Sequence, residues 1–337
     1  MRLVVMAHNG RFLAGDLVSR RRLRVSGVSL VGNIRGYGLL LGLLVLGGIL
    51  SILSPVFPTP ANLLDIVVQS SVNGSIALGM TFVIATGGID LSVGSIWALT
   101  SIAVGLLVKH GLPWTLAIVF GLAAGVVCGS VTGLLVTKGG VPPFIATLGT
   151  MSIYRGLALI ISQGYTIYGF PRGLQFIGSG KVLMIPMPAI VLAIAFLITR
   201  FLFSRCAFGR HVVAIGGNKE AARLCGINVN KCVMGAYVVG AVLATVGGII
   251  ATARLDAAEP IAGNGAELDA IAAVVMGGTS LSGGEANIVG TLVGALVIGT
   301  VRNGLTLMNV PTFYQIATVG LIIIAAVLAE RAGRSRQ

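Results

Sequence analysis

The sequence predicts an all-α, polytopic membrane protein, because its composition is strongly apolar and its charges are absent from long stretches. Hydrophobic residues make up 55% of the 337 residues and charged residues 10%, and the mean hydropathy is +0.98. A helix rises about 1.5 Å per residue and the hydrocarbon layer of a bilayer is about 30 Å thick, so uncharged stretches of roughly twenty residues are typical of spanning helices. Asp, Glu, Lys and Arg are all absent from 36–64, 66–89, 111–137, 182–199, 232–253 and 303–329.

These stretches and the segments between them predict about ten spanning helices with both termini in the cytoplasm. The spans are expected at 36–54, 62–86, 89–108, 113–136, 142–163, 185–203, 231–253, 266–279, 287–308 and 312–330. Of the 23 basic residues, this arrangement places 17 on the cytoplasmic side, four outside and two within spans. Basic residues in short loops mark the cytoplasmic side, so the bias supports this topology.

Three parts of the chain follow from this topology. Residues 1–35 are expected to form a basic cytoplasmic tail, 36–330 a single membrane domain with a cytoplasmic loop at 204–230, and 331–337 a second cytoplasmic tail. The span at 266–279 is the weakest, because only about eleven helix-like residues precede its paired glycines. We therefore expect it to be a half-helix or a re-entrant segment.

The net charge of +13 does not indicate nucleic-acid binding. The basic residues flank apolar stretches, and aromatic residues make up only 6% of the chain, whereas nucleic-acid interfaces combine basic and aromatic side chains on a folded surface. The four cysteines form no C-x-x-C pair and the three histidines are far apart, which argues against a metal site or a disulfide. The chain also lacks a G-x-x-x-x-G-K-[ST] nucleotide-binding loop and any plausible catalytic constellation. We therefore expect no enzyme activity and no bound cofactor.

Glycine is abundant, and one glycine motif occurs twice. Residues 87–94 and 277–284 both read G-G-x-x-L-S-x-G, and each copy lies between two apolar segments. In transporters, paired helix breaks occur where they line a cavity or are buried in protein, so these copies are candidates for the solute pathway. An equally weighted alternative is a pair of tight interhelical turns. The candidate residues of the motif are Gly87, Gly88, Asp90, Ser92, Gly277 and Gly278.

A second glycine pattern predicts helix packing. Gly121, Gly125, Gly129 and Gly133 recur at every fourth position of one apolar stretch. Small residues at this spacing let membrane helices approach closely, which replaces the hydrophobic driving force that lipid does not supply. We therefore interpret this stripe as structural.

Asp90 has two possible roles. A carboxylate at the centre of a span costs about 2.5–3.5 kcal/mol on insertion scales, so its presence needs a reason. Asp90 is either a helix N-cap that accepts a hydrogen bond from a backbone N–H two or three residues later, or a contact for the solute. The first role is the favoured one.

Other polar groups near or within spans divide between solute contacts and ordinary structural roles. Gln69 and Asn73 share a helix face at i, i+4 spacing, and their uncharged amides suit a polyol, with interhelical hydrogen bonding as the equal alternative. Arg155 and Arg302 lie near span ends, where long side chains usually reach toward the interface. The acidic residues of 254–269 are expected to be ordinary solvated loop charges.

The stretch 218–226 predicts a short capped helix in the cytoplasmic loop. Asn218 is a good N-cap, Glu220 lies at the positive end of the helix dipole and Gly226 is a good residue to follow the C-terminus. Such a helix between two spans could transmit movement from a partner. The residues of this candidate are Asn218, Glu220, Ala221, Ala222 and Gly226.

Three motifs, in order, resemble the ribose-type permease subunits of bacterial ABC importers. They are Gly79–Ile84 running into Gly87–Ser95, Gly216–Asn218 with Ala221–Leu224 and Gly226–Lys231, and Glu267–Leu281. The resemblance covers about residues 50–330. It implies a multi-pass protein of the bacterial inner membrane that moves ribose or a related monosaccharide by alternating access.

The resemblance also implies partners. They are a second copy of the chain, two cytoplasmic ATPase subunits that carry ATP-Mg, a periplasmic sugar-binding protein and the surrounding lipid, with no nucleic acid. The 218–226 stretch resembles the coupling helix that docks into the ATPase. A different class of function, an ion-coupled secondary carrier for a small polar solute, would need buried titratable groups in the pathway. Asp90 is the only plausible one, with Asp65 near the outer interface.

Overall fold

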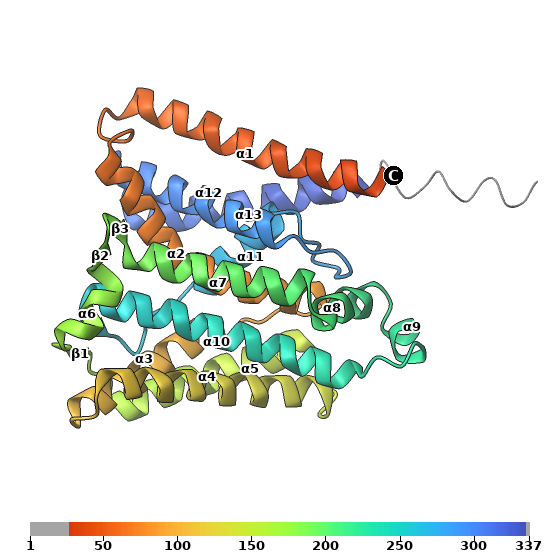
Figure 1. Cartoon of the computed structure of the whole chain (residues 1–337), viewed down its shortest axis with the longest axis horizontal. Helices are drawn as coiled ribbons and strands as arrows, with labels where there is room; N and C mark the ends of the chain where they lie inside the picture. Colours follow the sequence, from red (N-terminus) through yellow and green to blue (C-terminus); the bar gives the residue numbers. More distant parts are fainter. Residues whose placement is uncertain (1–26, 335–337) are drawn as a thin grey trace, which may run out of the picture.

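The structure is a computed structural model that describes residues 27–334. It is a bundle of helices whose axes run mostly along the long dimension of the molecule (Figure 1). The helices are α1 (Gly27–Leu53), α2 (Pro60–Ala85), α3 (Val93–Lys109), α4 (Trp114–Thr137), α5 (Pro143–Ser162), α6 (Arg172–Ser179), α7 (Met187–Ser204), α8 (Ala207–Gly217), α9 (Lys219–Leu224), α10 (Val229–Leu255), α11 (Ala266–Met276), α12 (Ile288–Leu307) and α13 (Thr312–Arg334). The strands are β1 (Ile167–Tyr168), β2 (Lys181–Val182), β3 (Ile185–Pro186) and β4 (Ala257–Ala258).

The bundle has two distinct ends. At one end, β1 pairs antiparallel with β4, β2 pairs antiparallel with β3, and α6 lies beside them. We call it the strand end. At the opposite end, α8 and α9 project from the bundle (Figure 1), and we call it the α9 end.

Helices occur at each of the ten predicted span positions, namely α1–α5, α7 and α10–α13. By length and composition, six helices in the described part of the chain are long and apolar enough to cross a membrane: α2, α4, α5, α7, α10 and α12. The weak span is α11, whose 11 residues extend only about 16 Å, as expected for a half-helix.

The structure differs from the predicted boundaries at both ends of the chain and in two loops. Residues 27–35, predicted as tail, belong to α1, and 331–334 belong to α13. The predictions for 1–26 and 335–337 lie outside the described residues. The sequence also did not predict α6 in the strand-end loop or α8 before α9. Both are short, and the charges and glycines within them obscure the apolar pattern of a helix.

The centre of the bundle is formed by α2 and α10. The most apolar windows of α2 and α10 are 78% and 61% buried, compared with 22% for α7. The predicted glycine stripe is confirmed as a packing surface: a methyl group at Gly129 would lie 2.7 Å from the carbonyl oxygen of Tyr237 in α10, and one at Gly133 would lie 3.0 Å from Met234. Backbone contact of this kind is open only to glycine.

Candidate functional site

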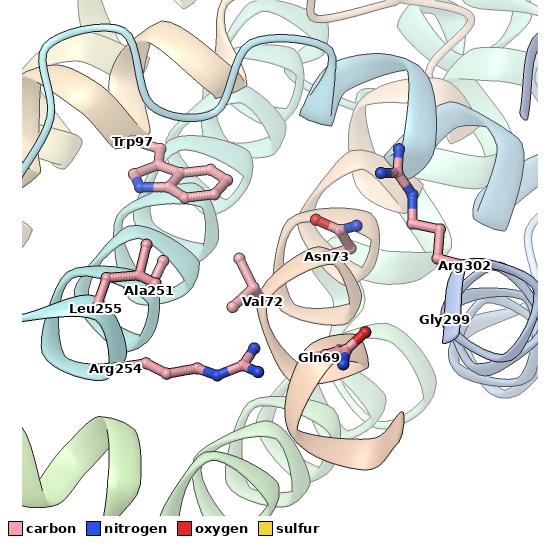
Figure 2. A pocket seen from close by; sticks show the side chains of 9 residues that line it. All are labelled: Gln69, Val72, Asn73, Trp97, Ala251, Arg254, Leu255, Gly299 and Arg302. Atoms are coloured by element: carbon pink, nitrogen blue, oxygen red, sulfur yellow. The ribbon is translucent and has the colours of Figure 1, made fainter. Parts of the chain in front are cut away.

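The predicted pathway residues separate into two places. Gln69 and Asn73 line a pocket of about 220 Å³ in the strand-end half of the bundle. We call it the Trp97 pocket; it is lined by Gln69, Val72, Asn73, Trp97, Ala251, Arg254, Leu255, Gly299 and Arg302. Figure 2 shows Trp97 from α3 and Arg302 from α12 on opposite sides, with the two amides of α2 between them. Four helices therefore converge on one small cavity.

A three-member network fixes one wall of this pocket. A guanidinium nitrogen of Arg302 donates to Asp269 Oδ1 at 2.8 Å, and Asn73 Nδ2 donates to Asp269 Oδ2 at 3.0 Å. The Asp269 side chain is 7% exposed and that of Arg302 is 30% exposed. The Asp269 carboxylate has lost most of its hydration, so it depends on these two partners for compensation. The network joins α2, α11 and α12.

Two predictions about charged residues are wrong here. Arg302 does not reach toward the interface but turns into the protein to pair with Asp269, and Asp269 is buried instead of solvated. Arg155 is different: its guanidinium donates to the carbonyl oxygens of Pro260 and Ala262, in the loop between β4 and α11, at 2.8 and 2.7 Å. Partners that are remote in sequence decided these orientations, so span position alone was a poor guide.

The two copies of the repeated motif meet each other at the α9 end. The backbone N–H of Gly284 donates to the carbonyl oxygen of Ala85 at 3.1 Å, and a methyl group at Gly283 would lie 2.7 Å from the backbone nitrogen of Gly87. The last turn of α8 packs into the same place, because a methyl group at Gly216 would overlap both Ala85 O and Gly284 N. We call this cluster of Ala85, Gly87, Gly216, Gly283 and Gly284 the glycine junction.

Each helix break contains one glycine in the left-handed backbone conformation. It is the first glycine of the pair in the first copy of the motif and the second glycine in the second copy. Gly87 has φ +82° and Gly278 has φ +87°, conformations that side chains strongly disfavour. Gly88 and Gly277 are constrained by space instead: a methyl group would lie 2.9 Å from the Tyr237 hydroxyl at Gly88 and would collide with the backbone of Gly290 at Gly277. The tight-turn interpretation of the repeat therefore describes the local geometry.

Asp90 lies in the first break and is fully buried. Its Oδ1 accepts hydrogen bonds from the Ser92 backbone N–H at 2.8 Å and from the Ser92 hydroxyl at 2.6 Å. The bond from a backbone N–H two residues later is the one expected for a capping role, although the residue that precedes α3 is Ser92 itself. Asp90 therefore forms a local turn that leads the chain into α3.

One oxygen of Asp90 is left over. Its Oδ2 has no hydrogen-bond partner among the described residues, and neither does the buried hydroxyl of Tyr237 in α10. These groups lie where α3, α5 and α10 surround the first break, and Thr147 of α5 donates to the carbonyl oxygen of Ile89 at 3.2 Å. The break is thus enclosed by protein.

The short helix α9 has the predicted caps. Asn218 Oδ1 accepts a hydrogen bond from the Ala221 N–H at 2.9 Å, and Gly226 follows the helix with φ +82°. Glu220 pairs with Arg223 at 3.3 Å on the exposed surface. Ala222 is buried, whereas Leu224 is 88% exposed. α9 therefore packs against the bundle through the small side chain of Ala222 and exposes the apolar side chain of Leu224.

Asn218 connects α9 directly to the glycine junction. It ends α8, because its N–H donates to Ala214 O at 3.0 Å, and it also caps α9. Gly216, which packs against both copies of the motif, is only two residues earlier. One short, hydrogen-bonded connection therefore links α9 to both helix breaks.

Comparisons with known proteins identify the relatives of this chain. A family model described as the permease component of branched-chain amino acid transport systems matches residues 62–327. The ribose import permease protein of Bacillus subtilis strain 168 is 48% identical over 302 residues, 89% of this chain and 94% of the relative. The D-allose transport system permease protein of Escherichia coli K12 is 41% identical over 297 residues, 88% of this chain and 91% of the relative.

A third relative is the ribose import permease protein of Escherichia coli K12, which is 45% identical over 295 residues, 86% of this chain and 92% of the relative. No solved structure gives a significant match. The resemblance inferred from the three motifs is confirmed by these similarities. The chain belongs to the family described as the permease component of branched-chain amino acid transport systems, and within it to the ribose-type permeases of ABC importers.

Proposed function

We propose that this chain is the pore subunit of an ATP-driven importer for ribose or a related monosaccharide in the bacterial inner membrane. The support is its similarity to relatives named for ribose and D-allose over nearly their whole length. The family description names branched-chain amino acids instead, and the more specific relatives favour sugar. The ion-coupled carrier receives no support from the comparisons.

The α9 end faces the cytoplasm in this proposal, and the strand end faces outward. Six basic residues lie between Arg200 and Lys231, around α8 and α9, which is the positive-inside pattern. The ten helices at the predicted positions then cross the membrane, with α11 reaching only part of the way. Both termini lie in the cytoplasm.

The assembly contains two copies of this chain, two ATPase subunits and a periplasmic sugar-binding protein. The chain has no nucleotide-binding loop of its own, so ATP-Mg is bound and hydrolysed by the ATPase subunits. The chain itself catalyses no reaction. The binding protein delivers the sugar to the strand end.

The observation that carries the mechanism is the short connection from α9 to the glycine junction. The exposed Leu224 gives α9 an apolar contact for an ATPase subunit. When the ATPase subunits close on ATP, α9 moves as a rigid body, and Gly216 moves both helix breaks together because it packs against both. Alternating access follows, with the motif glycines acting at the gate and Gln69 and Asn73 contacting the solute.

Reconstitution in proteoliposomes tests the proposal. Uptake of D-ribose, D-allose or L-arabinose is expected only with the ATPase subunit, internal ATP and the binding protein. Uptake driven by a proton or sodium gradient without ATP contradicts the proposal. Uptake of L-leucine but no sugar would keep the importer class and overturn the monosaccharide.

Glu220 tests the role of α9. Glu220→Lys is expected to abolish ATPase association and uptake while leaving membrane insertion unchanged, because it inverts the charge on the projecting helix. The matched control is the exchange Glu220→Lys with Arg223→Glu, which restores the ion pair within α9 but keeps the surface altered. If the exchange restores uptake, α9 only needs its internal pair and the docking role is wrong.

A further inference from the structure

In the Trp97 pocket, polar side chains from several helices converge on space large enough for a small solute. We infer that it binds one neutral monosaccharide, with the sugar ring against the indole of Trp97 and the hydroxyls against Gln69, Asn73 and Arg302. The inference rests on the proposed function and assigns a site to it. It makes the pocket an intermediate station in the permease, between the binding protein and the gate.

The position of the pocket suits an intermediate station. Gln69 and Asn73 lie 9 and 13 residues after the first residue of α2, about 14 and 20 Å along the helix. Arg254 and Leu255, at the end of α10, are exposed and border the pocket, so it communicates with the outside of the protein. The glycine junction lies beyond it, at the other end of α2.

Trp97 supplies the apolar wall. The indole is half-buried, and it is held by two glycines: a methyl group at Gly248 would lie 2.6 Å from its Cδ1, and one at Gly263 would lie 2.7 Å from its Cε3. Sugar rings present C–H groups on their faces, and these groups pack on the negative face of an aromatic ring. A rigid indole therefore orients a ring while hydroxyls remain free at its edge.

The polar walls match hydroxyl groups. The amides of Gln69 and Asn73 can both donate and accept, as sugar hydroxyls do, and Arg302 supplies donors only. The Nε of Arg302 is buried without a hydrogen-bond partner among the described residues. A buried donor left unpaired is unfavourable, so a hydroxyl oxygen that accepts from it would be stabilised. Figure 2 shows the guanidinium of Arg254 extending across the pocket toward the helix that carries Gln69.

The charge of the pocket favours a neutral ligand. Arg302 is already neutralised by Asp269. Arg254 lies in the last turn of α10, where the helix dipole carries partial negative charge and favours a cation. Arg254 is also exposed, so water and salt screen its charge, which leaves only a weak attraction for an anionic sugar derivative, while the N–H groups of both arginines still bind hydroxyls. The contacts are few, as expected for a site that must release its solute.

The two tryptophans of the chain allow a direct test, because Trp97 and Trp114 are the only ones. Full-length Trp114→Phe protein in liposomes carries the indole of the pocket alone, and Trp97→Phe protein carries the other indole as a matched control. Titration with D-ribose is expected to change the fluorescence of the Trp114→Phe protein in a saturable way and leave the Trp97→Phe protein unchanged. Ribose 5-phosphate and L-leucine are expected to have at least about tenfold weaker effects, the difference that one unfavourable or missing contact makes.

Uptake by the complete importer supplies the second measurement. Trp97→Ala is expected to lower sugar uptake about tenfold at low sugar concentration, with partial recovery in Trp97→Phe, which keeps an aromatic ring. Trp114→Phe is the control and is expected to transport like the wild type. ATPase association is expected to be unchanged in all three, which separates this site from the docking helix.

The outcomes distinguish the site from the function. If the wild type takes up no sugar under any of the proteoliposome conditions, the proposed function fails. If the wild type transports sugar but Trp97→Ala transports equally well and the Trp97 fluorescence does not respond, the function stands and the pocket is not a sugar site. A stronger response to ribose 5-phosphate than to ribose would overturn the neutral ligand.

Discussion

The strand-end half and the α9 end of this permease differ in the atoms that connect their helices: polar side chains at the Trp97 pocket and backbone atoms at the glycine junction. The Trp97 pocket is lined by long polar side chains around open space, and its wall is fixed by side-chain hydrogen bonds between helices. The glycine junction has no such side chains: three backbone segments touch there directly. Side chains can rearrange around a passing solute, whereas backbone segments in contact move as a unit. The difference suits the pocket to binding and the junction to transmitting movement.

The largest effect is expected at the ion pair of the pocket. Arg302→Leu leaves the buried carboxylate of Asp269 without its charged partner, and breaking a buried pair in this way costs about 3–5 kcal/mol of folding free energy. Thermal unfolding of the purified protein in detergent measures the loss. Sugar uptake by the Arg302→Leu variant is also expected to disappear.

The double variant Arg302→Leu with Asp269→Leu tests whether the pair acts for stability or for the solute. Removing both charges is expected to recover most of the stability, because no uncompensated charge remains. Sugar uptake is expected to stay low, since the donors are gone. Full recovery of uptake would mean that the pair is only a structural part of the pocket wall.

At the glycine junction, Gly216→Val is expected to abolish uptake and to destabilise the protein by about 1–3 kcal/mol, the usual cost of overpacking. The new side chain would collide with the backbone of Ala85 and Gly284, neither of which can turn aside like a side chain. Uptake and thermal unfolding measure the two effects.

Gly217→Ala is the matched control, because nothing lies within 4 Å of the position that its methyl group would take. It is expected to behave as the wild type. If Gly216→Val transported normally, the junction would be open in the working protein and the contrast between the two regions would be lost.

A smaller effect is expected at a second side-chain pair of the strand-end half. Asn62 of α2 and Asn303 of α12 exchange two buried amide hydrogen bonds, at 3.0 and 2.8 Å. Asn62→Ala is expected to cost about 1–3 kcal/mol, because the Asn303 amide is left unpaired. The double alanine variant is expected to cost less than the sum of the single variants when thermal unfolding is measured. Additive losses would show that this pair does not hold the helices together.

The smallest effect is expected at Asp90. Asp90→Asn keeps the Oδ1 atom that accepts both Ser92 hydrogen bonds and removes only a charge whose other oxygen has no partner among the described residues. Insertion and uptake are expected within about twofold of wild type. Asp65→Asn, at an exposed position of α2, is the control. Loss of uptake in Asp90→Asn alone would assign a function to the ionised carboxylate.

Helix positions and local caps were predictable because they depend on residues close together in the sequence. Uncharged stretches placed the helices at the ten predicted positions, and Asn218 with Gly226 bounded α9 correctly. The repeated motif and its pairing are visible in the sequence, but the direct contact between its two copies is not. Nothing in the sequence indicated that Gly216 would lie between them.

The sequence by itself determined that this is a membrane permease of the ribose type, where its helices lie, and which short helix projects between two spans. Tertiary structure alone decided which polar groups meet. Asn73 and Asp269 are 196 positions apart, and Arg302 joins them from a third helix. The sequence therefore does not show what compensates the charges of Asp269 and Arg302; only the packing of the helices does. The physical reason is that apolar stretches specify burial one helix at a time, whereas pairing of buried polar groups depends on how several helices face one another.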